Sequence, residues 1–308
     1  MSFHVVVGTS AAGIATARML AESGERVRIL SRSGGGPQHP LIEPIAADAR
    51  DAARLTELTS GATTLFNCAT PAYDMLPVET PALAAALLTA AERSGAGYLN
   101  LSNTYGYGPP APGEPMTEDL PMSPTTIKGR VRAQMWQDAI TAHDQGRIRF
   151  TEVRPGDFIG PGQPSMFNLL IAPPVLAGEP TAVPADLDAP HSWSHPGDAA
   201  NALVTLSRDE QAWGRAWHVP PISDATVREV TKRFAELAGA PAPQLISMSP
   251  LDLHNAGLAD PIIAQTWEMQ YQYQRPFVLD ASLTAKTFGL TPTPLNDVLL
   301  ETAESFAS

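Results

Sequence analysis

The stretch that decides the fold is Gly8-Thr9-Ser10-Ala11-Ala12-Gly13, which follows a short apolar run and precedes a segment of helical period. It is a GxGxxG loop with Ser10 in the second glycine position. In such a loop the first glycine permits a tight turn, and the N–H groups of the helix terminus face a pyrophosphate. An ordinary strand–helix turn is the alternative, but a second strand ending on schedule at Leu30 favours dinucleotide binding. The residues assigned to this loop are Gly8, Ser10, Ala11, Ala12 and Gly13.

Short apolar runs alternate with helical patterns through the first half of the chain. Strands are predicted at residues 5–7, 27–30, 64–66, 98–101 and 149–153, and helices at 14–21, 83–91 and 131–140. We expect Thr80-Pro81 to start the second of these helices and Gly95 to end it. Alternation of this kind predicts an α/β fold, a Rossmann-type doubly wound parallel sheet.

The pattern changes after about Gly162, because prolines crowd residues 164–196 and the strand–helix rhythm weakens. Helix boundaries are signalled by Asp198 before 199–207, by a Thr226–Glu229 capping box, by Gly239, and by Thr293-Pro294 before the last helix. We therefore expect a smaller, partly helical C-terminal substrate domain beside the nucleotide-binding one. The predicted division is 1–163, joined by about 198–222, against 164–197 and 223–308.

The composition excludes several classes of protein. The chain has 308 residues, of which 44% are hydrophobic and 17% charged, so a sizeable core is available and global disorder is excluded. A net charge of −12 without any Lys/Arg run argues against a nucleic-acid or anionic-membrane partner. The single cysteine, Cys68, fits a reducing compartment, and the longest apolar stretch, 82–91, is about half of a membrane span. We expect a cytoplasmic protein, monomeric or homodimeric, with a small-molecule partner.

The end of the second predicted strand bears on cofactor choice. An acidic residue there holds the ribose 2′-hydroxyl of NAD, whereas an arginine accommodates the 2′-phosphate of NADP. The chain reads Ser31-Arg32-Ser33 and then three glycines, with no acid. Arg32 is a planar fork suited to phosphate, although a solvated surface arginine is the alternative. NADPH/NADP+ is favoured over NAD(H).

Over nearly its whole length the chain resembles the extended or atypical short-chain dehydrogenases/reductases, which include the NAD-dependent epimerases/dehydratases. The matching segments are 47–48 (adenine contact), 67–70 (loop beside the nicotinamide ribose), 102–108 ("SSxxVYG"), 154–162 ("RpxNVYGPG") and 191–198 ("RDFIHVxD"). With residues 31–33 added, the cofactor contacts expected beyond the glycine loop are Ser31, Arg32, Ser33, Asp48, Ala49, Cys68, Ala69, Thr70, Lys128, Pro155, Gly156, Asp157 and Phe158.

The catalytic motif of the family is not intact. Its acid is the tyrosine of YxxxK, but Lys128 follows a proline, Pro124, four residues earlier, and proline has no proton to give. The resemblance also implies a Ser/Thr partner, for which the register leaves Ser102, Asn103 and Thr104 open. The missing proton could come from Tyr105 or Tyr107, from Lys128 through water, or from a hydroxyl on the substrate beside its ketone. The candidate catalytic residues are Lys128, Ser102, Asn103, Thr104, Tyr105 and Tyr107.

His191 stands where the family has an arginine that grips the diphosphate of sugar nucleotides, and a neutral imidazole is a poor clamp for that group. His191 and His195 are four apart, but Pro196 and the flanking Ser-Trp-Ser predict an extended segment, so no metal site is expected. The second half is aromatic instead, and residues 261–274 could form a lid, although aromatic stripes are more often core. The substrate contacts expected are Tyr73, Phe167, His191, Trp193, Trp267 and Tyr271.

Three functions are compatible with these patterns. The first is an NADPH-dependent ketoreductase acting on a bulky aromatic or polycyclic ketone, because the departures are similar to those of the ketoreductases in angucyclinone antibiotic pathways. The second is a non-catalytic NADP(H)-binding sensor, which the retention of Lys128 opposes. The third is a sugar-nucleotide epimerase or dehydratase, which Pro124 and His191 oppose.

Overall fold

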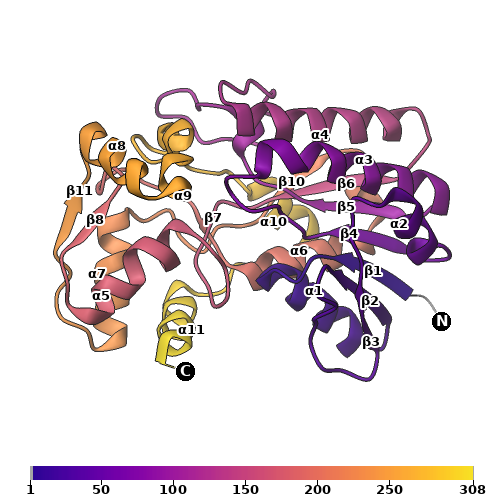
Figure 1. Cartoon of the computed structure of the whole chain (residues 1–308), viewed down its shortest axis with the longest axis horizontal. Coiled ribbons are helices and arrows are strands. Elements are labelled where there is room, and N and C mark those ends of the chain that lie inside the picture. The colour runs from indigo at the N-terminus through magenta and orange to yellow at the C-terminus, as the bar shows by residue number, and fades with distance from the viewer. Residues whose placement is uncertain (1–2, 308) are drawn as a thin grey trace. The chain divides into compact units, whose positions relative to one another are not determined.

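A computed structural model describes residues 3–307, except for the side chain of Pro261, and the chain divides into two compact units (Figure 1). The first unit comprises the described residues up to Gly106, Lys128–Arg154 and Gly197–Trp217. The second comprises Tyr107–Ile127, Pro155–Pro196 and the described chain from His218 onward. Residues 107–127 and 155–163, which we expected in the nucleotide-binding domain, group with the second unit because they pack on its segments rather than on the sheet.

The first unit is built on a seven-stranded sheet of order β10-β6-β5-β4-β1-β2-β3. Its strands are β1 (Phe3–Val7), β2 (Arg26–Ser31), β3 (Ile42–Ala46), β4 (Thr64–Asn67), β5 (Gly97–Leu101), β6 (Phe150–Arg154) and β10 (Ala216–His218). The pairings that join β3, β2, β1, β4, β5 and β6 are all parallel, which confirms the predicted fold class. The strand order reverses direction at β1 and β4, and such a switch point is where ligands bind in open α/β sheets.

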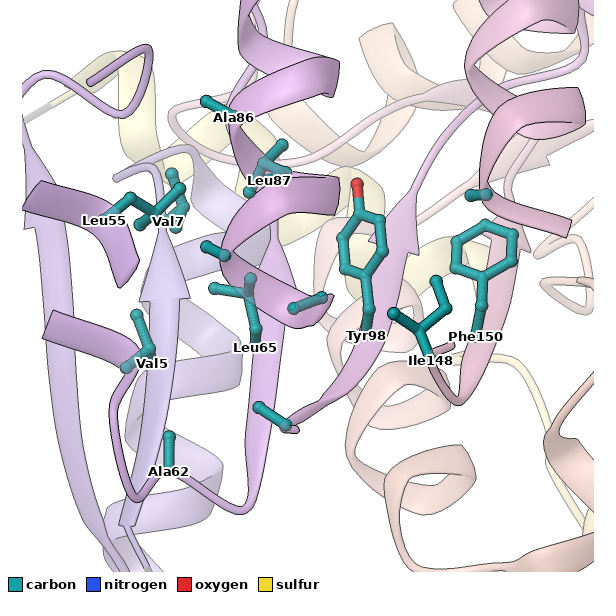
Figure 2. Packing of buried hydrophobic residues seen from close by; sticks show 14 of the residues in the cluster. Val5, Val7, Leu55, Ala62, Leu65, Ala86, Leu87, Tyr98, Ile148 and Phe150 are labelled. Atoms are coloured by element: carbon teal, nitrogen blue, oxygen red, sulfur yellow. The ribbon is translucent and has the colours of Figure 1, made fainter. Parts of the chain in front are cut away.

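Helices cover both faces of this sheet, with α2, α3 and α4 on one and α1 and α6 on the other (Figure 1). They are α1 (Ala11–Glu22), α2 (Ala52–Thr59), α3 (Leu76–Ser94), α4 (Ile127–Asp144) and α6 (Pro196–Ser207), with a 3-10 turn at Glu210–Ala212. Figure 2 shows Val7 and Leu65 from the strands packed with Leu55 and Leu87 from the helices. Full burial of one such side chain is worth about 1.5–3 kcal/mol, so the apolar face of each helix holds it on the sheet.

Two predicted helix starts are wrong. α3 begins at Leu76 rather than after Thr80, and Pro81 lies inside it, with Pro77 in the first turn. The side chain of Leu76 is buried, so two more turns of apolar contact outweigh the hydrogen bond that Pro81 cannot make. α6 begins at Pro196, which places Asp198 in its first turn instead of at its cap.

Other boundary signals are confirmed. Gly95 ends α3 with a left-handed φ of 72°, a conformation that glycine adopts without steric cost. In the second unit, Thr226 and Glu229 form the predicted capping box, and Gly239 ends that helix. The last helix starts directly after Pro294.

The second unit is irregular and partly helical, with two sheets of two strands each. Its strands are β7 (Asp157–Phe158), β8 (Thr181–Val183), β9 (Trp193–Ser194) and β11 (Leu245–Ser247). Its helices are α5 (Ala172–Ala177), α7 (Val227–Ala238), α8 (Pro250–Ala259), α9 (Pro261–Ala264), α10 (Ser282–Phe288) and α11 (Leu295–Ala307), with a π-helix at Phe167–Ile171 and 3-10 turns at Tyr105–Tyr107 and Trp267–Gln272. No helix within residues 3–307 is both long and apolar enough to cross a membrane.

Candidate functional site

The glycine loop after β1 has the geometry that its sequence predicts. Gly8 has a φ of 103°, and a Cβ there would lie 2.6 Å from the backbone nitrogen of Ala69. A Cβ on Gly13 would lie 2.3 Å from the carbonyl oxygen of Gly8. Both positions therefore require glycine, one for the turn and one for the close packing of α1 on the strand.

Ser10, which departs from the glycine pattern, is the N-cap of α1. Its Oγ accepts a hydrogen bond from the backbone N–H of Gly13 at 3.2 Å and donates one to the carbonyl of Cys68 at 3.0 Å. The hydroxyl thus ties the glycine loop to the segment that follows β4. Burial raises the pKa of the Cys68 thiol to about 12, so Cys68 is a packing residue here rather than a nucleophile. Ala11 and Ala12 form the first turn of α1.

The end of β2 and the segment after β3 carry the charges of the predicted adenosine end. Arg32 and Ser33 are exposed, and no acidic side chain occurs in residues 31–36. Asp48 accepts hydrogen bonds from Arg50 at 2.8 and 3.0 Å, which lower the pKa of that carboxyl to about 2, with a smaller contribution from Arg32. Arg50 was missed by the sequence analysis, although the Asp-x-Arg spacing directly after a strand could have indicated it.

Lys128 lies in the first turn of α4 with 0% of its side chain exposed. Its Nζ is 4.7 Å from the centre of the Tyr73 ring, a cation–π contact within the first unit. Of the possible partners after β5, Ser102 and Thr104 are buried and Asn103 is half-buried. The side chain of Asn103 accepts the backbone N–H of Tyr105 at 3.1 Å, so it serves the local turn.

Arg132 follows Lys128 by one helical turn and is 4% exposed, but the sequence analysis did not single it out. Its Nη2 lies 3.5 Å from the Oγ1 of Thr70, in the loop after β4. Burial lowers the pKa of Arg132, while the nearby Tyr105, Glu152 and Tyr98 oppose that shift. The i, i+4 spacing from Lys128 was the signal that could have found it.

A chain of buried polar groups crosses the sheet beneath this helix. The Nδ2 of Asn67 donates to Asn100 at 2.8 Å, and the Nδ2 of Asn100 donates to Glu152 at 2.7 Å. The other oxygen of Glu152 accepts from the Nε of Arg154 at 2.7 Å. Asn67 also accepts the backbone N–H of Ala69, so the chain of bonds reaches the loop after β4.

In the second unit, the hydroxyl of Tyr107 is buried and lies 2.8 Å from the Nε2 of His218. The Nδ1 of His218 donates to the carbonyl oxygen of Asp280 at 2.9 Å, which leaves Nε2 as the acceptor for the phenol. The phenol proton of Tyr107 is therefore directed at His218. Tyr105 belongs to the first unit and is half-buried.

His191 is 3% exposed, and its Nε2 donates to the Oδ2 of Asp157 at 3.0 Å. Its ring stacks on Tyr273 and Phe277, with centres 5.3 and 5.9 Å apart and interplanar angles of 21° and 25°. Trp193 lies against the same imidazole at 4.8 Å. The histidine is thus enclosed by aromatic rings and one carboxylate.

The remaining predicted contacts of the second unit differ in exposure. Phe167 and Trp193 are fully buried in its core, whereas Trp267 is 52% exposed. Tyr271 is half-buried against a small cluster that includes Tyr107, and the neighbouring Glu268 accepts the backbone N–H of Ile127 at 2.7 Å. Pro155 and Phe158 flank Gly156 and Asp157 on or before β7, where a Cβ on Gly156 would lie 2.3 Å from the carbonyl of Ser192. Within residues 3–307, no three His, Cys, Asp or Glu side chains gather as metal ligands would.

A parallel seven-stranded sheet with a glycine loop at its switch point defines a Rossmann-type nucleotide-binding protein. The chain belongs to the NAD dependent epimerase/dehydratase family, whose model matches residues 5–219. This confirms the family resemblance at that level. No curated protein sequence matches the chain significantly.

Several solved structures share the fold over the whole chain. MoeE5 in complex with UDP-glucuronic acid and NAD is 20% identical, with a TM-score of 0.80 and coverage of 100% of this chain and 99% of that one. The dTDP-glucose 4,6-dehydratase of Bacillus anthracis in complex with NAD is 14% identical, with a TM-score of 0.81 and coverage of 100% and 97%. The UDP-glucose 4-epimerase of Thermotoga maritima with UDP-glucose is 17% identical, with a TM-score of 0.79 and coverage of 100% and 99%.

Proposed function

We propose that the chain is an NADPH-dependent ketoreductase whose substrate is a bulky aromatic or polycyclic ketone. The observation that carries this proposal is His191, at the position where the resemblance implies a diphosphate-binding arginine. Its imidazole is buried, stacked on Tyr273 and Phe277, and bonded to Asp157. An imidazole so paired offers little charge to a diphosphate, whereas aromatic and apolar surroundings suit a flat ligand.

The residues of the first unit fit a nicotinamide dinucleotide. The N-terminus of α1, behind Gly8, presents backbone N–H groups of the kind that bind a pyrophosphate. The NAD held by the similar structures supports this class of cofactor, and the exposed Arg32 without an acidic neighbour supports a 2′-phosphate. Lys128 would hold the nicotinamide ribose. When bound, the reduced cofactor would supply the hydride for the ketone carbon.

The source of the proton is the second part of the proposal. Pro124 has no proton, and that of Tyr107 is directed at His218. Tyr105 and Lys128 through water are the protein alternatives. We favour a hydroxyl on the substrate beside its ketone, which donates to the carbonyl oxygen before hydride reaches the carbon. The hydroxyl gives its proton as the alkoxide forms and regains one from water, so no protein acid is needed. An angucyclinone antibiotic pathway in a reducing cytoplasm is the setting that this chemistry suits.

A sugar-nucleotide epimerase or dehydratase is the second candidate. Membership of the epimerase/dehydratase family favours it, as do the UDP-glucose and UDP-glucuronic acid bound to similar structures. Such a substrate requires a cationic partner for its diphosphate, and His191 is not one. A non-catalytic NADP(H) sensor is a third reading, which has no use for a buried lysine at the reacting end of the cofactor.

A substrate panel separates these functions. The purified full chain is incubated with NADPH and a hydroxyaryl ketone, the methyl ether of that ketone, or UDP-glucose, and loss of the reduced cofactor is followed. The proposal expects turnover of the hydroxyaryl ketone and at least about tenfold less of the ether, whose binding is measured separately. Conversion of UDP-glucose without turnover of any ketone would establish the second candidate. Binding of NADPH without any turnover would support the sensor.

A further inference from the structure

The interior of the first unit holds more Lys and Arg charge than carboxylate. Lys128, Arg132 and Arg154 are all buried, and Glu152 is the sole buried Asp or Glu among the described residues of this unit. A buried cation loses its hydration and is costly unless a counter-ion or hydrogen-bond acceptors replace the water. The position of Glu152 therefore decides which of these cations is neutralised.

Glu152 is committed to one side of the group. Its Oε1 accepts from Arg154 at 2.7 Å, and its Oε2 accepts from the amide of Asn100 at 2.7 Å. Arg132 has no ion pair within the described part of the chain, and its buried Nε meets no hydrogen-bond acceptor there. Its charge is only partly offset, through space, by Glu152. Arg132 is thus the uncompensated cation of the unit.

The place of Arg132 gives this charge a direction. Its guanidinium reaches Thr70, in the loop after β4, at 3.5 Å. Lys128 is one turn earlier on the same face of α4. The proposed function assigns both Thr70 and Lys128 to the nicotinamide ribose. An uncompensated positive charge therefore lies behind the part of the loop that would hold the reacting end of the cofactor.

The two redox forms of a nicotinamide differ in charge at this end. The oxidised ring carries a positive charge, and the reduced ring is neutral. A fixed cation in a poorly hydrated environment repels the first and not the second, and solvent screens such an effect far less than it does at the surface. The adenosine and phosphate portions are the same in both forms, so they do not contribute to the difference.

We propose that Arg132 makes the chain selective for the reduced cofactor, and thereby sets the direction of its reaction toward reduction. Arg132 is a specificity-determining residue in this scheme, and it also favours release of the oxidised product. The inference rests on the proposed function, because it requires the nicotinamide end to lie near Thr70. It concerns binding, and so it can be tested without any substrate.

The experiment measures the dissociation constants of NADPH and NADP+ for the full chain and three variants. Arg132→Gln removes the charge, Arg132→Lys keeps it, and Arg130→Gln removes an equal charge from an exposed position of the same helix. We expect wild-type protein to bind NADPH more tightly than NADP+. The ratio of the two constants should fall about three- to tenfold in Arg132→Gln and change less than about twofold in the two controls.

The outcomes distinguish this inference from the proposed function. If Arg132→Gln weakens both forms equally, or leaves the ratio unchanged, Arg132 does not select a redox form and the inference is wrong. If the wild-type chain binds neither form, the proposed function fails first. Should thermal melting show that Arg132→Gln does not fold, Arg132→Met, which fills the same volume without charge, replaces it and must lower the ratio in the same way.

Discussion

The two units differ in what they bury. In the first, charged and amide side chains occupy the interior along α4 and strands β4 to β6, with Lys128 and Arg132 on the helix and Glu152 on the sheet. In the second, the interior is mainly aromatic and apolar, and its two buried histidines, His191 and His218, are each bonded to a partner inside the unit. A buried charge is expensive, so a unit that keeps one has a use for it. This contrast supports a division in which the first unit holds a charged cofactor and the second a neutral, flat substrate.

The largest effect should come from the charged interior of the first unit. Lys128→Ala should lower kcat/KM at least about 100-fold, because loss of the ribose contact disturbs the placement of the reacting atoms. Arg130→Ala, an exposed cation two residues further along α4, is the matched control and should stay within about twofold. Steady-state kinetics with NADPH and a hydroxyaryl ketone measures both. A loss of less than about threefold in Lys128→Ala would remove this residue from the site.

Arg32 tests whether the first unit distinguishes its cofactors. Arg32→Ala should weaken NADPH binding by about 1.5–3 kcal/mol, the usual worth of a hydrogen bond to a charged group, and leave NADH nearly unchanged. Titration of protein fluorescence with each cofactor provides the two constants. Equal losses for both cofactors would mean that Arg32 does not contact the 2′-phosphate.

Tyr107 tests the opposite expectation for the second unit, where a buried phenol should matter to folding and little to chemistry. Tyr107→Phe leaves the Nε2 of His218 without its donor, so the free energy of unfolding should fall by about 1–2 kcal/mol. Turnover should stay within about tenfold of wild type. Urea unfolding and kinetics check the two parts.

Tyr105→Phe is the companion variant, because Tyr105 lies in the first unit and is half-buried. Under substrate assistance its turnover also stays within about tenfold, well short of the 10²–10⁴ that a general acid contributes. A collapse of kcat in either variant, with folding and NADPH affinity intact, would show that a tyrosine has taken the role lost at Pro124.

The smallest effect concerns residues 267–272, the proposed lid. Trp267 is half-exposed, whereas Met269 is buried and Glu268 accepts the N–H of Ile127. We expect faster amide exchange here than in α7 of the same unit, and about two- to fivefold slowing when substrate binds. Glu268→Gln keeps an acceptor for Ile127 and should change turnover by less than about threefold. Exchange that substrate leaves unchanged would return these aromatics to the core.

Local chemistry determined much of this protein. The alternation of apolar runs predicted the sheet, the glycine spacing predicted the loop at Gly8 and Gly13, and the capping box at Thr226 predicted a helix start, because each signal acts within a few residues of itself. Pro124 announced the missing acid in the same way. The start of α3 could not be predicted so, since burial of Leu76 against the sheet decided it.

The tertiary structure decided what depends on distant partners. Tyr107 meets His218, 111 residues further along the chain, and Asn100 meets Glu152, 52 residues further. Nothing in the local sequence states that Glu152 serves Arg154 and leaves Arg132 uncompensated, because the choice follows from which side chains share the interior once the strands are paired. Periodicity and caps are local free energies, whereas the neutralisation of a buried charge is a property of the folded interior.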